Sequence, residues 1–348
     1  MDVGPPRVKV RHGENAAMGN RKTWITAGLL GVIALVICGV LLSLGNEEEA
    51  PSLVQYQPKY IDAGAMLRFT ETLSSDALEG RATGTRGNQA ARDFIQKRFE
   101  TLGIQMLGGA FVHPFTATPD TEGDSSVNGA NVVGMIKGTT DGPVLLITAH
   151  YDHLGVIDGE IYNGADDNAS GTAALIDVAQ YFTRHKPVHD IVFAALDGEE
   201  IGLLGAHALM EDASVPMQRV VLNMNYDMVS RSEIGELYVA GTFHNPDLLP
   251  LVERVASEAP VKLIAGHDDP ALGAADDWTS QSDHSVFHDA GIAFLYFGVE
   301  DHPGYHTPSD DYANITPDFF ARAGDTLVMA AMAADEELDI IGGEKAAD

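Results

Sequence analysis

The sequence is almost free of cysteine and has few basic residues. Its one cysteine, Cys38, lies near the N-terminus, so the chain beyond it can form neither a disulfide nor a cysteine-based metal site. Lysine and arginine together number 21, against 51 aspartates and glutamates, which gives a formal net charge of −30. This balance argues against nucleic acid as a partner, because phosphate binding requires a basic surface. We interpret the acidity as a solubility feature of the surface.

One long hydrophobic run stands out, "ITAGLLGVIALVICGVLLSL", at residues 25–44. It contains no charged residue and has the length of a membrane-spanning helix. Basic residues precede it and Glu47, Glu48 and Glu49 follow it, a distribution that places the N-terminus in the cytoplasm. We therefore expect a cytoplasmic tail over residues 1–24, a single-pass anchor over 25–44, and the remainder in the periplasm or outside the cell. A signal peptide cleaved near Ser43–Gly45, followed by secretion, is the alternative.

The rest of the chain alternates between helical and strand patterns. Residues 45–60 are polar and contain proline, as in a linker, and a globular domain is expected over 61–342 with a disordered tail over 343–348. Helical spacing occurs at 63–73, 87–103, 171–185, 200–212, 246–258 and from 317, and strand patterns occur at 129–138, 142–152, 190–197, 219–228, 235–241 and 291–298. This alternation predicts an α/β fold, a three-layer α/β/α sandwich around a mixed, largely parallel sheet.

Metal-binding residue types follow four of the expected strands. His150 and Asp152 come after one strand, Glu199 and Glu200 after the next, and Asp227 and His306 after two more. Asp166 and Asp167 lie in a Gly- and Asn-rich turn before a helix. Because ligands gather at the carboxyl ends of strands in open α/β sheets, we expect one shared site.

The composition of this group indicates a metal centre. Imidazole and carboxylate ligands suit Zn²⁺, with Co²⁺ or Mn²⁺ as substitutes, and the number of anions exceeds what one zinc requires. Two metals can share a bridging carboxylate, as in two-metal hydrolases. The sequence contains no G-x-S-x-G elbow and no H-E-x-x-H helix, so these other hydrolytic solutions are excluded.

Five motifs then resemble a known family. "AHYDHLG", "NGADDNASG", "LDGEE", "NYDMV" and "GYHTPSDD", in this order, are similar to the di-zinc exopeptidases related to bacterial leucyl aminopeptidase. Relatives of that family include glutamate carboxypeptidase II and the glutaminyl cyclases. The upstream segment "LSSDALEGRATGTRGNQAARDFI" resembles its bacterial members, so the likeness extends from about Ile61 to the last helix.

The resemblance implies a role for each residue of the site. Two zinc ions would be held by a set of five ligands: His150, Asp166, Glu200, Asp227 and His306. Of these, Asp166 would bridge the two metals, with a strained, cis Asp166–Asp167 peptide aiming its oxygens. Glu199 would be the general base, and Asp152 would accept the free imidazole N–H of His150 and orient that ligand.

The implied activity is removal of N-terminal amino acids from peptides. Two alternatives from the same family are a carboxypeptidase or dipeptidase and, with a single zinc, a glutaminyl cyclase. A non-catalytic receptor-like protein on this fold is the alternative from another class. Neither the substrate side chain nor the oligomeric state follows from the sequence.

Overall fold

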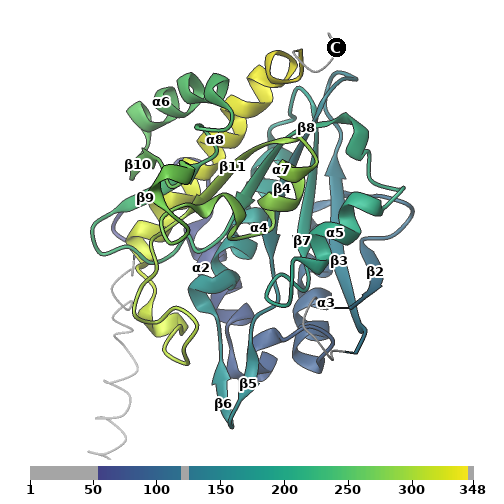
Figure 1. Cartoon of the computed structure of the whole chain (residues 1–348), viewed down its shortest axis with the longest axis vertical. Helices are drawn as coiled ribbons and strands as arrows, with labels where there is room; N and C mark the ends of the chain where they lie inside the picture. The colour runs from purple at the N-terminus through teal and green to yellow at the C-terminus, as the bar shows by residue number, and fades with distance from the viewer. Residues whose placement is uncertain (1–53, 119–124, 344–348) are drawn as a thin grey trace, which may run out of the picture. The chain divides into compact units, whose positions relative to one another are not determined.

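The computed structural model describes residues 54–118 and 125–343 (Figure 1). Within these ranges no helix is both long and apolar enough to cross a bilayer. The expected tail, anchor and first part of the linker, residues 1–53, lie outside the described residues. The mixed α/β class is confirmed, and the domain is built around one central mixed sheet.

A nine-stranded sheet forms the centre of the domain, and the β5–β6 hairpin projects from it (Figure 1). Its path runs β1-β3-β7-β4-β8-β11-β9-β10, and β2 pairs with β3 on the same side as β1. The strands are β1 (Gln105–Met106), β2 (Val112–Ala117), β3 (Val127–Ile136), β4 (Val144–His150), β5 (Gly155–Ile157), β6 (Glu160–Tyr162), β7 (Asp190–Leu196), β8 (Val220–Tyr226), β9 (Glu236–Ala240), β10 (Lys262–Ala265) and β11 (Ala293–Gly298).

The four central strands are parallel, and antiparallel pairs flank them. β7, β4, β8 and β11 pair in parallel, whereas β3 is antiparallel to β7 and β9 is antiparallel to β11. The expected largely parallel sheet is therefore correct for its centre, and the flanks are more antiparallel than expected. Parallel strands bring their carboxyl ends to one edge, which is where the functional residues come together.

Helices cover both faces of the sheet. Alternate residues of β4 point to opposite sides, so Leu145 and Ile147 join one hydrophobic cluster and Val144 and Leu146 join the other. The larger cluster packs α2 (Ala63–Leu73), α3 (Arg86–Leu102), α4 (Gly171–Arg184), α6 (Leu249–Glu258) and α8 (Pro317–Gly343). The smaller cluster packs α5 (Leu204–Glu211) and α7 (His284–Asp289).

The helix ends follow their capping residues. Asp62 accepts a hydrogen bond from the Ala65 N–H at the start of α2, and Thr85 accepts one from the Asn88 N–H at the start of α3. Gly103 ends α3 in the left-handed conformation, with φ of 70°. These signals explain why the expected bounds of α2 and α3 agree with the structure.

Elements without a clear sequence pattern were missed. The short strands β1, β2, β5, β6 and β10 have little apolar alternation of their own and form through pairing with neighbours. α5 begins at Leu204 rather than at Glu200, because a turn containing the left-handed Leu203 precedes it. That turn keeps Glu199 and Glu200 outside the helix.

Residues 54–61 pack on the last helix, although residues up to 60 were expected to belong to a linker. The Asp318 carboxylate accepts the backbone N–H groups of Gln55 and Tyr56. Asp325 accepts three more backbone N–H groups and the Tyr56 hydroxyl. The folded domain therefore begins earlier in the chain than the expected boundary.

The buried carboxyl of Asp177 makes the stability of this region depend on pH. Burial raises its pKa to about 7, and the charges of Asp62 and Asp325 add to this. An unfolded aspartate has a pKa near 3.9, so between pH 4 and 7 the folded chain holds more protons than the unfolded chain, and stability falls as the pH rises.

We expect Asp177→Asn to be more stable than the unaltered chain at pH 8, by about 2–4 kcal/mol. An amide cannot ionise and still offers an oxygen to the Asp62 N–H, which now lies 3.0 Å from Asp177 Oδ2. Urea unfolding from pH 5 to pH 8 measures the difference, with exposed Asp93→Asn as the control. A gain of equal size at pH 5 and pH 8 would contradict the expectation.

Candidate metal centre

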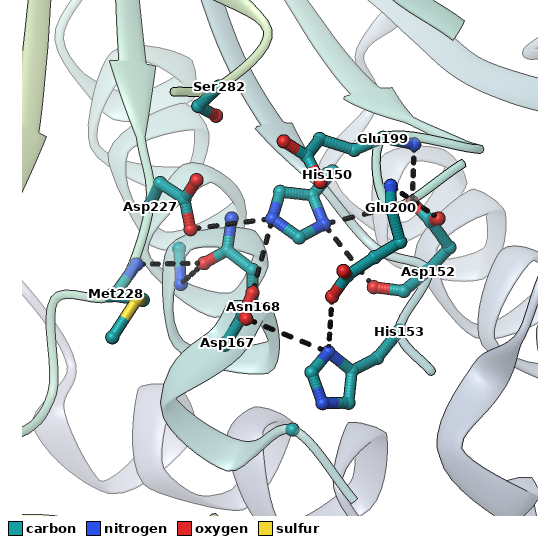
Figure 2. Close-up of polar contacts among 12 residues, drawn as sticks. His150, Asp152, His153, Asp167, Asn168, Glu199, Glu200, Asp227, Met228 and Ser282 are labelled. Atoms are coloured by element: carbon teal, nitrogen blue, oxygen red, sulfur yellow. Dashed lines mark hydrogen bonds and ion pairs between the residues drawn. The ribbon is translucent and has the colours of Figure 1, made fainter. Parts of the chain in front are cut away.

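The sequence-predicted site residues lie at the carboxyl ends of the four parallel strands. His150 is the last residue of β4, Glu199 and Glu200 follow β7, and Asp227 follows β8. His306 lies in the loop after β11. The aspartate pair lies in a segment, η2 (Ala165–Ser170), that leads into α4. Because β7, β4, β8 and β11 are neighbours, their ends bring these side chains together. Figure 2 shows five of them: His150, Asp167, Glu199, Glu200 and Asp227.

His150, Asp167 and Asp227 form a first group of candidate metal ligands. The Nε2 atom of His150 lies 3.3 Å from Asp167 Oδ1 and 3.3 Å from Asp227 Oδ1. All three residues are buried, and their ligand atoms lie within 4.8 Å of one another. Figure 2 shows the His150 ring between Asp227 on one side and Asp152 on the other, with Asp167 below.

A second group surrounds the other oxygen of Asp167. His153, Asp167 and Glu200 each offer a ligand atom within 4.8 Å of the others. The Nε2 atom of His306 lies 3.1 Å from Asp167 Oδ2 and 3.4 Å from Glu200 Oε2. The Asp167 carboxylate therefore faces His150 with one oxygen and His306 with the other.

The structure corrects the assignment of the aspartate pair. Asp166 was expected between the two halves of the site, but its Oδ1 accepts the N–H and the hydroxyl of Ser230, each at 2.7 Å. Its Oδ2 lies 3.2 Å from His302 Nε2. Asp167 takes the expected position. The cis peptide is likewise one residue further on, between Asp167 and Asn168.

The Asp152 carboxylate does not make the expected hydrogen bond with the His150 imidazole. Its Oδ1 lies 3.7 Å from His150 Nδ1, beyond hydrogen-bond length, and the closer acceptor is its own backbone oxygen at 3.3 Å. The carboxylate instead accepts the backbone N–H groups of Glu199 and Glu200, at 3.2 and 3.4 Å. Asp152 thus orients the turn that carries both glutamates.

Two further residues hold the Asp167 turn in place. Asp310 accepts the N–H of Asp166 and the N–H of Asp167, each at 2.9 Å. Asn168 donates to the Tyr226 oxygen at 2.9 Å and accepts the Met228 N–H at 3.3 Å. Since Tyr226 and Met228 flank Asp227, Asn168 fixes the strand end that carries this carboxylate next to Asp167.

Burial and crowding shift the pKa values of the site strongly. Burial raises the pKa of Glu199 well above its usual value, and the carboxylates of Asp283, Glu200 and Asp227 add to this. Burial alone lowers the pKa of His150, but Asp227, Glu199, Asp152 and Asp167 outweigh it and hold that pKa well above its usual range. The site thus gathers negative charge that favours a cation.

The residues present fit a metal. Buried carboxylates are normally paired or bound to a cation, yet Asp227 Oδ1 has no hydrogen-bond donor among the residues that the structure describes. Arg81 is the only buried arginine or lysine in residues 54–118 and 125–343, and its hydrogen bonds go to backbone oxygens. Imidazole and carboxylate ligands on two sides of Asp167 suit zinc.

A cavity of about 240 Å³ opens onto these residues. His150, Asp167, Glu199, Glu200, Asp227 and His306 line its polar side. Its other walls are formed by Met228, Trp278, Gln281, Tyr296, Val299, Asp301 and Tyr305. The cavity gives a substrate access to both groups of candidate ligands.

Sequence reasoning missed two residues next to the site. The Nδ1 atom of His153 lies 2.6 Å from Glu200 Oε1, and burial lowers the pKa of His153 to about 4, which keeps the ring neutral. Asp283 directly precedes α7, and its carboxyl makes no capping bond. Burial raises the pKa of Asp283 to about 8. The "HYDH" and "SDH" clusters were the available signals, but neither fixes where its side chains point.

The comparisons with known proteins agree with this geometry. The model of peptidase family M28 matches residues 131–331, more than half of the chain. The chain belongs to peptidase family M28. The matched range contains every candidate ligand described above, from His150 to His306.

Curated relatives of this M28 chain include bacterial and fungal proteins. Aminopeptidase YwaD of Bacillus subtilis is 29% identical over 330 residues, which cover 91% of this chain and 65% of the relative. A probable zinc metalloprotease of Pyrenophora tritici-repentis is 30% identical over 288 residues, which cover 71% of this chain and 63% of the relative. The chain thus spans slightly less than two thirds of the length of these relatives.

Solved structures share the M28 fold. The aminopeptidase from Aneurinibacillus sp. strain AM-1 superposes with a TM-score of 0.63 at 16% identity, covering 78% of this chain and 93% of that one. Porphyromonas gingivalis glutaminyl cyclase also gives 0.63, at 20% identity, covering 78% and 98%. At these identities the likeness establishes the fold and does not distinguish the two activities.

The two neighbouring aspartates should behave differently when altered. We expect Asp167→Asn to lose bound zinc, because an amide nitrogen cannot replace a carboxylate oxygen as a ligand. Asp166→Asn should keep the zinc content of the unaltered chain and lose about 1–3 kcal/mol of stability, because its carboxylate serves hydrogen bonds to Ser230. Metal analysis after dialysis and urea unfolding measure both. Zinc loss in Asp166→Asn with retention in Asp167→Asn would show that Asp166, and not Asp167, is the metal ligand.

Proposed function

We propose that the protein is a two-zinc exopeptidase that removes N-terminal amino acids from peptides. The observation that carries the proposal is the position of Asp167, whose two oxygens face His150 and His306 on opposite sides. A carboxylate placed in this way suits a bridge between two metals, and a single-metal site would use only one of the two sides. The name of the aminopeptidase relative supports the direction of cleavage.

The proposed ligand sets share Asp167. His150, Asp227 and Asp167 would hold one zinc, and Glu200, His306 and Asp167 would hold the other. His153 lies beside Glu200 and would orient it through their contact. When bound, the ions would polarise the scissile carbonyl and lower the pKa of the attacking water, and Co²⁺ or Mn²⁺ are expected to substitute.

Glu199 is proposed as the general base. It lines the cavity next to both ligand groups without belonging to either, so its carboxylate is free to take a proton from the attacking water. The same carboxyl can return that proton to the departing amine. Asp152 supports Glu199 by accepting its backbone N–H.

The proposed location remains the one expected from the sequence. Residues 25–44 would anchor the chain in a membrane with the N-terminus in the cytoplasm and the peptidase domain in the periplasm or outside the cell. Cleavage after the hydrophobic run would instead release a secreted enzyme. Peptides are the proposed substrate in either case.

Blocking one end of a peptide at a time tests the direction of cleavage. We expect the full-length chain with zinc to release the first residue of unblocked peptides and of C-terminally amidated peptides. N-acetylated peptides should be cleaved at least about 100-fold more slowly. Chelation of the metal should abolish release. Cleavage that tolerates the acetyl group but not the amide would favour a carboxypeptidase. Loss of ammonia from N-terminal glutamine without peptide-bond cleavage would favour a cyclase, and no reaction in any assay would favour a non-catalytic protein.

Glu199→Gln separates metal binding from proton transfer. The amide has nearly the same shape but cannot take a proton, so kcat should fall by about 10²–10⁴-fold while the zinc content stays unchanged. The matched control is Glu253→Gln, an exposed position on α6, which should change neither value. Activity within a few-fold of the unaltered chain would rule out Glu199 as the base.

A further inference from the structure

Arg81 lies behind the metal centre and is fully buried. Its guanidinium donates to four backbone oxygens: those of Tyr151 at 2.8 Å, Leu73 at 2.6 Å, Asn163 at 2.6 Å and Gly164 at 3.0 Å. None of these bonds goes to a carboxylate. Arg81 also lies outside the residues matched by the family model.

The four acceptors come from separate parts of the chain. Tyr151 lies between His150 and Asp152, and Asn163 and Gly164 lead directly into the aspartate turn. Leu73 is the last residue of α2. One side chain therefore joins the end of β4, which carries His150, to the segment that carries Asp167. A lysine has a single nitrogen and could not reach this set of acceptors in a fixed fork.

The backbone around Arg81 is arranged to bring its side chain inward. Glu79, Gly80 and Arg81 have φ values of 48°, 66° and 54°, three consecutive left-handed residues, two of which are not glycine. A Cβ at Gly80 would lie 2.3 Å from the Tyr162 oxygen, so the turn packs directly against the β5–β6 hairpin. Non-glycine residues adopt this conformation only where surrounding contacts enforce it.

Other side chains near Arg81 in the sequence also contact the loops that carry the site. Thr83 donates to Asp152 Oδ2 at 3.3 Å, and Asp76 accepts from the side chain of Asn163 at 2.8 Å. Asn88 donates to the Arg81 oxygen at 3.2 Å. The segment of residues 76–88 thus contacts both loops that Arg81 joins.

Arg81 keeps its charge in this position. Burial lowers its pKa to about 10, and the carboxylates of Asp167, Asp152, Asp310 and Glu200 act in the opposite direction. The guanidinium is therefore cationic at neutral pH. The positive charge of Arg81 would repel a bound metal ion. On electrostatic grounds alone, replacing Arg81 by a neutral residue would therefore strengthen metal binding. If an uncharged Arg81 variant binds metal more weakly, the cause must be a change in the positions of the ligands.

We propose that Arg81 is a positioning residue that sets the metal affinity of the site by holding the His150 and Asp167 segments in register. This inference rests on the proposed two-zinc function. Loss of the fork would let the two ligand segments move relative to each other, and residues that orient ligands typically change metal affinity or activity by about 10- to 100-fold.

The test compares Arg81→Lys and Arg81→Gln with Arg219→Lys in the full-length chain. Arg219 serves as the control, because it makes side-chain bonds far from the metal centre, to the Gly142 oxygen just before β4 and to Asp190 at the start of β7. Three quantities are measured: zinc affinity by chelator competition, the visible absorption spectrum with Co²⁺, and the gain in melting temperature on zinc addition.

We expect both Arg81 variants to bind zinc about 10- to 100-fold more weakly, with an altered Co²⁺ spectrum and a smaller zinc-induced gain in melting temperature. The loss should appear in kcat more than in KM. Arg219→Lys should lower the melting temperature and leave zinc affinity unchanged. Zinc affinity within twofold of the unaltered chain in Arg81→Lys, or tighter binding in Arg81→Gln, would overturn the proposal.

A measurement on the unaltered chain covers the case in which the Arg81 variants do not fold. Hydrogen exchange of residues 73–83, 150–153 and 163–167 should slow together when zinc is added to the chelator-treated protein. Independent responses of these segments would contradict a shared clamp. If the unaltered chain binds no zinc, the proposed function fails as well, whereas zinc binding that persists without Arg81 contradicts this inference alone.

Discussion

The structure depends on the burial of many carboxylates at one edge of a parallel sheet. Asp152, Asp167, Glu200 and Asp227 meet where β7, β4, β8 and β11 end, and burial removes the water that would otherwise solvate their charge. Bonds from backbone N–H groups satisfy Asp152, whereas Asp167 and Asp227 both approach the same nitrogen of His150, Nε2. A bound cation would compensate this charge. The fold and the metal site are thus linked. The strand order that brings the ligands together also concentrates the negative charge that a metal would neutralise.

The sequence predicted which strands carry the site, because the ends of the strands and the residue types that follow them are both visible in it. It could not predict which of two adjacent aspartates faces the cavity. Asp166 and Asp167 differ by one position in an irregular turn, and their directions depend on Ser230 and Asp310, which lie far away in the chain. The same limit applies to Asp152, whose carboxylate turns toward the β7 turn instead of His150. Contacts made across the sheet decide such orientations, and no local pattern encodes them.

The elements of the fold also divide into those that local sequence encodes and those that depend on contacts with distant segments. α2 and α3 carry their own capping residues, so their bounds could be predicted from local sequence. β10 and the β5–β6 hairpin are short and obtain their regularity from neighbours, so no single stretch of sequence marks them. Arg81 belongs to this second kind: nothing in "LEGR" says that its side chain is buried, and only the assembled loops show four oxygens around it.

The way in which α8 holds residues 54–61 resembles a receptor that binds an extended peptide by its main chain. Asp318 and Asp325 accept backbone N–H groups at positions 55, 56, 59, 60 and 61, so these bonds are indifferent to the side chains there. Only a residue without an N–H group would break them, and the one proline of the segment, Pro58, occupies a position whose N–H neither carboxylate requires. The path of this segment is therefore specified mainly by main-chain bonds, and the side chains of Tyr56, Tyr60 and Ile61 add contacts of their own with the domain.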